Sequence, residues 1–367
     1  MQPMSQWNSP RQTVNPNMVI LARESRGLSQ QALADALEVG QSYVSKIETG
    51  VFAVSDEKLE ALSRALDYPP HFFFQGGSLL GVGISEMFHR KRQDVPQKVL
   101  SKIHACVEIR IRNLAALLRV MEMTCDVPHY GIDEFADPED IARMTRAHWH
   151  MSRGPVQDVV QTLESMGVMI VEMDFETTKV DAISRWIPGL PPIFFVNVSI
   201  PKDRLRYTLA HELGHMVMHD TASPNMEDEA NLFAAEFLMP AQDVRADLAG
   251  LTLPKLAQMK RYWKVAMTAL LVRAEQLETI SMNKARSLWA QISAAGYKTH
   301  EPIELSLDGE HPMLLHQLVE AHLARLGYTP TEMAKLLPLN ERELWSFYLR
   351  DQSREALPRP RKLHAVE

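Results

Sequence analysis

Residues 203–220 read DRLRYTLAHELGHMVMHD, and this stretch guides the interpretation of the rest of the chain. Its apolar residues recur at helical spacing, at Leu205, Leu209, Leu213 and Met216. This periodicity predicts an amphipathic helix.

Two histidines in this helix have the spacing of metal ligands. His211 and His215 lie four residues apart, so both rings project from one face about one turn apart. Glu212 is rotated by about 100° from that pair, which still lets it reach a water held by the ion. Gly214 costs helix stability, about 1 kcal/mol relative to alanine, but leaves room for a crossing element or a substrate backbone.

A second predicted helix offers the third ligand. Residues 227–239 read EDEANLFAAEFLM and end before Pro240. A catalytic zinc has three protein ligands and one open position, and two histidines with one glutamate are a known set. Glu227 and Asn231 lie four residues apart, so the carboxylate can bind metal while the amide holds a ligand histidine. Glu229 is the alternative third ligand, and the preference for Glu227 rests on this geometry together with a family resemblance.

A competing interpretation is a helical hairpin whose histidines are solvated or satisfied in the core. It leaves the matched positions unexplained, so we prefer the metal site.

The two stretches resemble the ImmA/IrrE family of zinc metallopeptidases. The resemblance extends upstream to Gly154-Pro155-Val156 and to LESMGVMIVEMDF at 163–175. It also covers two small hairpin-like strands, around 182–184 and at 193–200.

This resemblance implies a set of roles for the residues of the motif. The metal, zinc or alternatively manganese, is held by His211, His215 and Glu227, and Glu212 is the general base. Asn231 and His219 are outer partners of the ligands. Tyr207 and His219 are also candidates to stabilise the oxyanion. Characterised members of the family cleave transcriptional repressors, so a repressor is the implied protein substrate.

Residues 18–75 carry a second informative pattern. Apolar residues at helical spacing, broken by short turns, predict four or five short helices. Ser29 is placed as a helix N-cap and Gly50 as a C-terminal stop. The segments SQQALADAL and QSYVSKIETG are joined tightly, as in a helix-turn-helix whose second helix enters the DNA major groove.

The stretch LSQQALADALEVGQSYVSKIETG at 28–50 resembles the lambda-repressor-like (XRE) family. The resemblance implies an operator in double-stranded DNA and a homodimer. Gln30 contacts the DNA backbone, and the base-facing residues are Gln41, Ser42, Tyr43, Ser45 and Lys46.

Two positions depart from the XRE pattern. Glu38 stands where the turn usually has glycine, and Gly40 stands where the recognition helix usually has a serine cap. Acidic residues also outnumber basic ones in this module, which weakens its nonspecific attraction to phosphate. The alternative interpretation is a small helical module for protein interaction.

Composition bounds the remaining possibilities. The 367-residue chain has a net charge of −7 and two cysteines, so no disulfide framework or cysteine-based zinc site is expected, and a reducing cytoplasm fits. The polar first residues do not read as a signal peptide, and no apolar run approaches the ~20 residues of a membrane span.

The predicted fold is mostly α with a small β-sheet (α+β), with a gluzincin-like core. Its predicted parts are a disordered tail (1–17), a helix-turn-helix domain (18–75), a helical connector (76–137), the metallopeptidase core (138–245) and a helical C-terminal domain (246–367).

The connector and the C-terminal region contain three further patterns. Residues 88–92 form a basic cluster, interpreted as solvated linker in preference to a contact with DNA flanking the operator. Residues 97–123 form a long amphipathic helix that suits a dimer seam or a brace between domains equally well. Residues 327–348 have the residue pattern of a second helix-turn-helix, but Pro330 and Pro338 indicate helices that pack against the rest of the protein and do not read DNA.

Two functions of different class follow. In the first, the chain is a DNA-binding regulator whose zinc endopeptidase cleaves a repressor in response to a signal. That repressor is either a partner or the chain itself, which would be cut after Phe74 in the glycine-containing stretch 76–83. In the second, the metallopeptidase fold is a sensor or scaffold without proteolysis.

Overall fold

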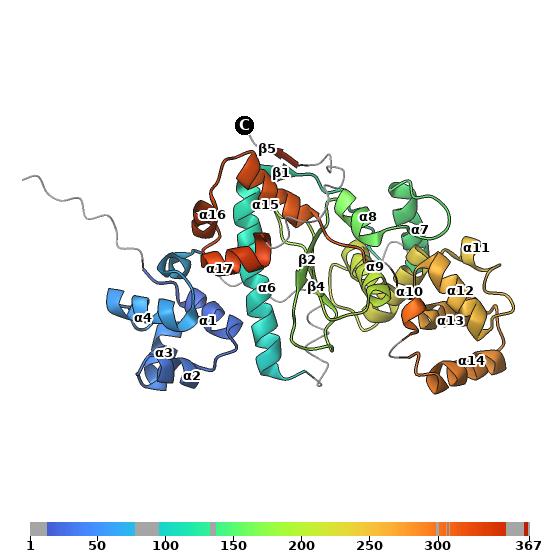
Figure 1. The fold of residues 1–367 in the computed structure, drawn as a ribbon, viewed down its shortest axis with the longest axis horizontal. Helices are drawn as coiled ribbons and strands as arrows, with labels where there is room; N and C mark the ends of the chain where they lie inside the picture. Colours follow the sequence, from blue (N-terminus) through green and yellow to red (C-terminus); the bar gives the residue numbers. More distant parts are fainter. Residues whose placement is uncertain are drawn as a thin grey trace, which may run out of the picture. The chain divides into compact units, whose positions relative to one another are not determined.

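The structure is a computed structural model and describes residues 13–77, 95–132, 137–298, 301–305, 307, 309–349 and 363–365. The chain is mostly helical with a small sheet, as the sequence predicted. It divides into two compact units. Unit 1 contains 13–77, 95–121 and 316–349, and unit 2 contains most of the intervening residues. Figure 1 shows the elements of both units.

Unit 1 begins with the helices of the predicted helix-turn-helix. They are α1 (Pro16–Ser25), α2 (Gln30–Ala36), α3 (Gln41–Glu48), α4 (Asp56–Leu66) and the 3-10 turn η1 (Pro70–Phe74). The Ser29 side chain accepts from the amide of Ala32 and caps α2, as predicted. Glu38 adopts a left-handed φ of 54°, so the turn keeps the conformation that glycine would favour.

The long helix α6 (Gln97–Leu117) completes this part of unit 1. Its apolar face packs against α1 of the same unit. The helix ends before the predicted bound of 123, because the chain turns through η2 (Leu118–Val120) into the extended segment β1 (Met121–Met123).

The C-terminal helices belong to unit 1 as well. They are α15 (Leu314–Ala324, which starts in unit 2), α16 (Pro330–Leu336), α17 (Glu341–Leu344) and the π-helical turn η4 (Trp345–Leu349). Pro330 occupies the first turn of α16, where its missing N–H costs nothing. Arg26 joins this segment to the helix-turn-helix: it pairs with Glu343 at 2.6 Å and donates to the carbonyls of Leu66 and Asp67.

Unit 2 is built around a three-stranded sheet of order β2-β4-β3. Its strands are β2 (Met169–Met173), β3 (Ala182–Arg185) and β4 (Ile193–Asn197). β4 pairs parallel with β2 and antiparallel with β3, in agreement with the hairpin-like strands that the sequence predicted. Every residue of β4 is buried.

Among the described residues, eight helices of unit 2 share one apolar core with residues of this sheet. They are α7 (Pro138–His148), α8 (Val159–Ser165), α9 (Lys202–Met218), α10 (Met226–Leu238), α11 (Ala241–Val244), α12 (Leu253–Trp263), α13 (Met267–Gln276) and α14 (Met282–Ala294). Two short elements, η3 (Ile303–Leu305) and β5 (Leu363–Ala365), follow later in the chain. None of the described helices is long and apolar enough to cross a membrane.

Candidate functional sites

Helices α9 and α10 pack closely because a glycine lies where they cross. A Cβ atom built on Gly214 would lie 3.1 Å from the ring of Phe233 on α10. Gly214 therefore makes room for a crossing element, one of the two roles that the sequence suggested. The approach brings the histidines of α9 to the first turns of α10.

His211, His215 and Glu227 converge at this crossing, as predicted. The Nε2 atoms of the two histidines lie 3.0 Å apart. The carboxylate of Glu227 lies 3.7 Å from His211 Nε2 and 3.4 Å from His215 Nε2. Among the described residues, this is the one group of His, Cys, Asp and Glu side chains whose ligand atoms could hold a single metal ion.

Glu212 lies next to the cluster on α9 and is only 4% exposed. Its Oε2 atom is buried and makes no hydrogen bond within the described part of the chain. A buried carboxylate oxygen is costly unless another group satisfies it. This oxygen is therefore suited to accept a hydrogen bond from a water or a substrate group.

The second nitrogen of each histidine has a partner of its own. His211 Nδ1 lies 3.0 Å from Asn231 Oδ1, one turn along α10 from Glu227. Since an amide oxygen only accepts, His211 donates from Nδ1 and leaves Nε2 for the cluster. Burial, followed by the neighbouring His215, lowers the pKa of His211, which favours the neutral ring that metal binding requires.

His215 is held by a histidine and a carboxylate in series. His215 Nδ1 lies 3.2 Å from His219 Nδ1, and His219 Nε2 lies 2.9 Å from Glu229 Oε2. If Nε2 of His215 faces a metal, its proton is on Nδ1, so His219 accepts at Nδ1 and donates from Nε2 to Glu229. Glu229 thus faces His219 and not the cluster. Sequence reasoning considered Glu229 only as an alternative ligand.

The two oxyanion candidates are both engaged in hydrogen bonds. The hydroxyl of Tyr207 donates to the backbone carbonyl of Asn231 at 3.0 Å, and burial raises the pKa of Tyr207 to about 12. Both ring nitrogens of His219 are occupied by His215 and Glu229.

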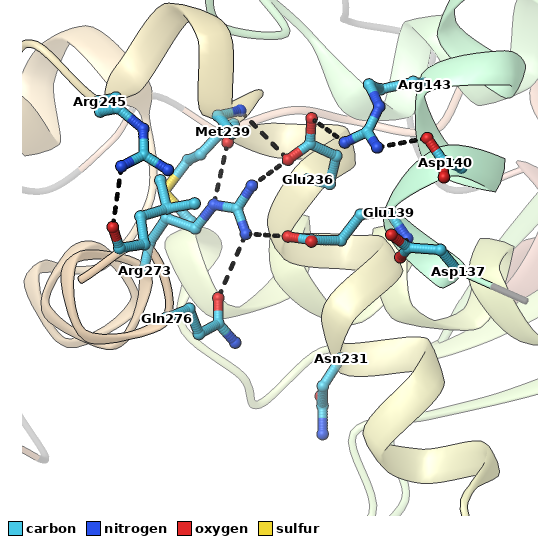
Figure 2. A network of polar contacts seen from close by, with 12 residues as sticks. Asp137, Glu139, Asp140, Arg143, Asn231, Glu236, Met239, Arg245, Arg273 and Gln276 are labelled. Carbon is cyan, nitrogen blue, oxygen red and sulfur yellow. Dashed lines mark hydrogen bonds and ion pairs between the residues drawn. The ribbon is translucent and has the colours of Figure 1, made fainter. Parts of the chain in front are cut away.

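A buried ion-pair network fixes the other end of α10 (Figure 2). Glu236 is fully buried and pairs with Arg273 of α13 and, at 3.1 Å, with Arg143 of α7. Arg273 also pairs with Glu139 at 2.5 Å. Removing one partner of such a buried pair costs about 3–5 kcal/mol. The network therefore holds the helix that carries Glu227 and Asn231, and it accounts for Glu236 lying away from the cluster.

The predicted DNA-facing residues lie on α2 and α3 of unit 1. Gln41 Nε2 donates to Gln30 Oε1 at 2.6 Å, so the predicted backbone and base contacts are adjacent. Gln41, Ser42 and Lys46 are exposed, while Tyr43 and Ser45 are half-buried. The ring of Tyr43 and the ammonium of Lys46 both contact Phe52.

Two predicted features lie outside the described residues. They are the basic cluster at 88–92 and most of the glycine-containing stretch at 76–83.

Comparison with known families agrees with both halves of this description. Residues 19–73 match a helix-turn-helix family model, and residues 163–275 match the model of the IrrE N-terminal-like domain, a peptidase family. No curated protein matches the chain. The chain therefore joins an XRE-like helix-turn-helix domain to a domain of the ImmA/IrrE peptidase family.

Proposed function

We propose that this protein is a DNA-binding transcriptional regulator whose zinc-dependent endopeptidase domain cleaves a repressor, itself or a partner, in response to a signal. It binds a double-stranded operator as a homodimer and acts in the cytoplasm. One observation carries the enzymatic part: His211, His215 and Glu227 converge beside the buried, unpaired carboxylate oxygen of Glu212.

The donor set fits zinc. Bond lengths of about 2.0–2.1 Å and tetrahedral angles separate neighbouring ligand atoms by about 3.3 Å. The corresponding atoms here are 3.0, 3.4 and 3.7 Å apart. Manganese also accepts imidazole and carboxylate ligands, so it remains an alternative ion. When bound, the ion supplies Lewis-acid activation of a water and of the peptide carbonyl.

The side chains of the site have two further roles, proton transfer and orientation of the histidines. Glu212 accepts the proton of the attacking water and passes it to the leaving amine. Asn231 orients His211, and His219 with Glu229 orients His215, so that both Nε2 atoms point toward one position.

An alternative function is a non-proteolytic regulator that uses the peptidase fold as sensor or scaffold. One observation favours it: Tyr207 and His219, the two candidates for stabilising an oxyanion, already hydrogen bond to other protein groups. A peptidase that lacks such a donor would depend on the ion alone for this stabilisation.

The substitution Glu212→Gln separates the two functions. It preserves shape and metal ligands but removes the proton acceptor, so we expect normal metal and DNA binding without a cleavage product. Purified protein would be incubated with zinc or manganese and with its own helix-turn-helix segment, and products mapped by mass spectrometry. The matched control is Glu229→Gln. If wild type and Glu212→Gln give the same fragment, the sensor or scaffold function is favoured. The same conclusion follows if cells that express the wild-type protein contain no repressor fragment after induction.

A further inference from the structure

The helix-turn-helix domain has little positive charge of its own to offer DNA. Between positions 13 and 77, five basic residues stand against eight acidic ones. The basic residues are Arg23, Arg26, Lys46, Lys58 and Arg64. Neutralising phosphates with Lys and Arg supplies most of the sequence-independent affinity for DNA, so this deficit has to be met from elsewhere.

Two of these basic residues form ion pairs within unit 1. Arg23 pairs with Glu48 at 2.5 Å, and their side chains are only 10% and 4% exposed. Arg26 pairs with Glu343 and donates to two backbone carbonyls. Lys46 is then the basic residue of this set that lies on the recognition helix α3.

Helix α6 brings two lysines beside the turn that precedes α2. A Cβ atom built on Gly27 would lie 3.5 Å from Cδ of Lys102 and 3.9 Å from Cε of Lys98. Both lysines lie on the N-terminal half of α6, the helix that packs along α1 (Figure 1). Gly27 is three residues before Gln30, which hydrogen bonds to Gln41 at the start of α3.

We propose that Lys98 and Lys102 of α6 bind the DNA phosphate backbone beside the first helix of the helix-turn-helix. The proposal rests on the DNA-binding part of the proposed function. When the second helix of such a motif enters the major groove, the first helix crosses the backbone, so the turn that precedes it lies near phosphates. Two ammonium groups there add affinity and fix orientation without reading sequence. Helix α6 lies outside residues 19–73, which match the family model.

The salt dependence of DNA binding tests this proposal on the full-length protein. Binding to a duplex of arbitrary sequence would be measured by fluorescence anisotropy over a series of salt concentrations. Each lost phosphate contact reduces the slope of log affinity against log salt by about 0.9, so Lys98→Gln with Lys102→Gln should reduce it by about 1.8. The control is Arg64→Gln with Lys335→Gln, an equal change in charge at two exposed positions of unit 1. Its slope should equal that of wild type.

Each outcome is decisive. If the α6 double variant keeps the wild-type slope, the lysines do not contact phosphate, although the DNA-binding proposal stands. An equal reduction in the control reports only the change in net charge and overturns the assignment. If wild-type protein binds no duplex at any salt concentration, both proposals fail.

Discussion

At the scale of single residues, the proposed metal ligands give the most direct prediction. We expect purified wild-type protein to bind roughly one equivalent of zinc. His211→Ala and Glu227→Ala should each remove one of the three proposed ligands, so each variant should bind far less. Elemental analysis measures this, and His148→Ala is the control, because His148 pairs with Asp126 on a different part of unit 2. Full retention of metal in both ligand variants would contradict the site.

Glu229 gives a second prediction, because it contacts His219. Substitutions at Glu229 can therefore show whether it orients the histidines or binds the metal itself. Glu229→Gln keeps an oxygen that accepts from His219 Nε2, so metal affinity should stay close to wild type. Glu229→Leu removes the acceptor and should weaken metal affinity by about 10–100-fold, the usual effect of losing an outer partner. Chelator competition measures both. Loss of the ion from both variants would instead make Glu229 a ligand.

Residue spacing predicted which side chains of α9 and of α10 lie on one helix face, because positions four apart on a helix are neighbours. His211 and His215 lie one turn apart on one helix, as do Glu227 and Asn231, so each pair could be placed from the sequence alone. The link from His219 to Glu229 joins two helices. It depends on how those helices cross at Gly214 and Phe233, and spacing within one helix carries no information about that crossing.

At the scale of elements, the helix α8 and the segment that leads into α15 cap each other's helix starts within unit 2. Glu164 of α8 accepts from the amides of Met313 and Leu314 at the start of α15. Glu310 in turn accepts from the amides of Val159 and Val160 at the start of α8. Each carboxylate satisfies backbone donors that a helix start leaves without partners.

This mutual capping gives stability a pH dependence. Burial raises the pKa of Glu164 to about 7 from its usual 4.5. The folded chain then holds this proton more tightly than the unfolded chain, so its contribution to stability is largest below pH 4.5 and is lost as pH rises toward 7. Glu164→Gln keeps an acceptor without the charge. Relative to wild type, the variant should therefore become more stable as pH rises over this window, as urea denaturation measures.

The exposed Glu304 supplies the control for that experiment. Glu304→Gln should leave the pH profile of the denaturation midpoint unchanged. If Glu164→Gln also gives the wild-type profile, Glu164 ionises in the folded chain as it does in the unfolded chain, and the capping carboxylate is not the source of the dependence.

At the scale of the whole molecule, the division into units could not be predicted from local pattern. Helical periodicity identified 327–348 as helices that pack, but it did not indicate what they pack on. The structure joins them to the helix-turn-helix through Arg26 and Glu343, which are 317 positions apart in the chain. Asn340 adds two hydrogen bonds to Asp67. No sequence window contains both partners of such contacts, so only the folded chain reveals them.

That long-range pairing predicts a unit-specific loss of stability. Glu343 is 6% exposed, so Glu343→Ala leaves the guanidinium of Arg26 without its counter-charge and should cost about 1–3 kcal/mol. Hydrogen exchange measured by mass spectrometry should then quicken in α1, α4 and α6, while α9, α12 and α13 of unit 2 exchange as in wild type. Glu341→Ala on the same helix is the control, since Glu341 is exposed and its hydrogen bond is to Thr331 within the C-terminal segment. Equal acceleration in both units after Glu343→Ala would show that they unfold together, and that the C-terminal helices do not stabilise the DNA-binding unit selectively.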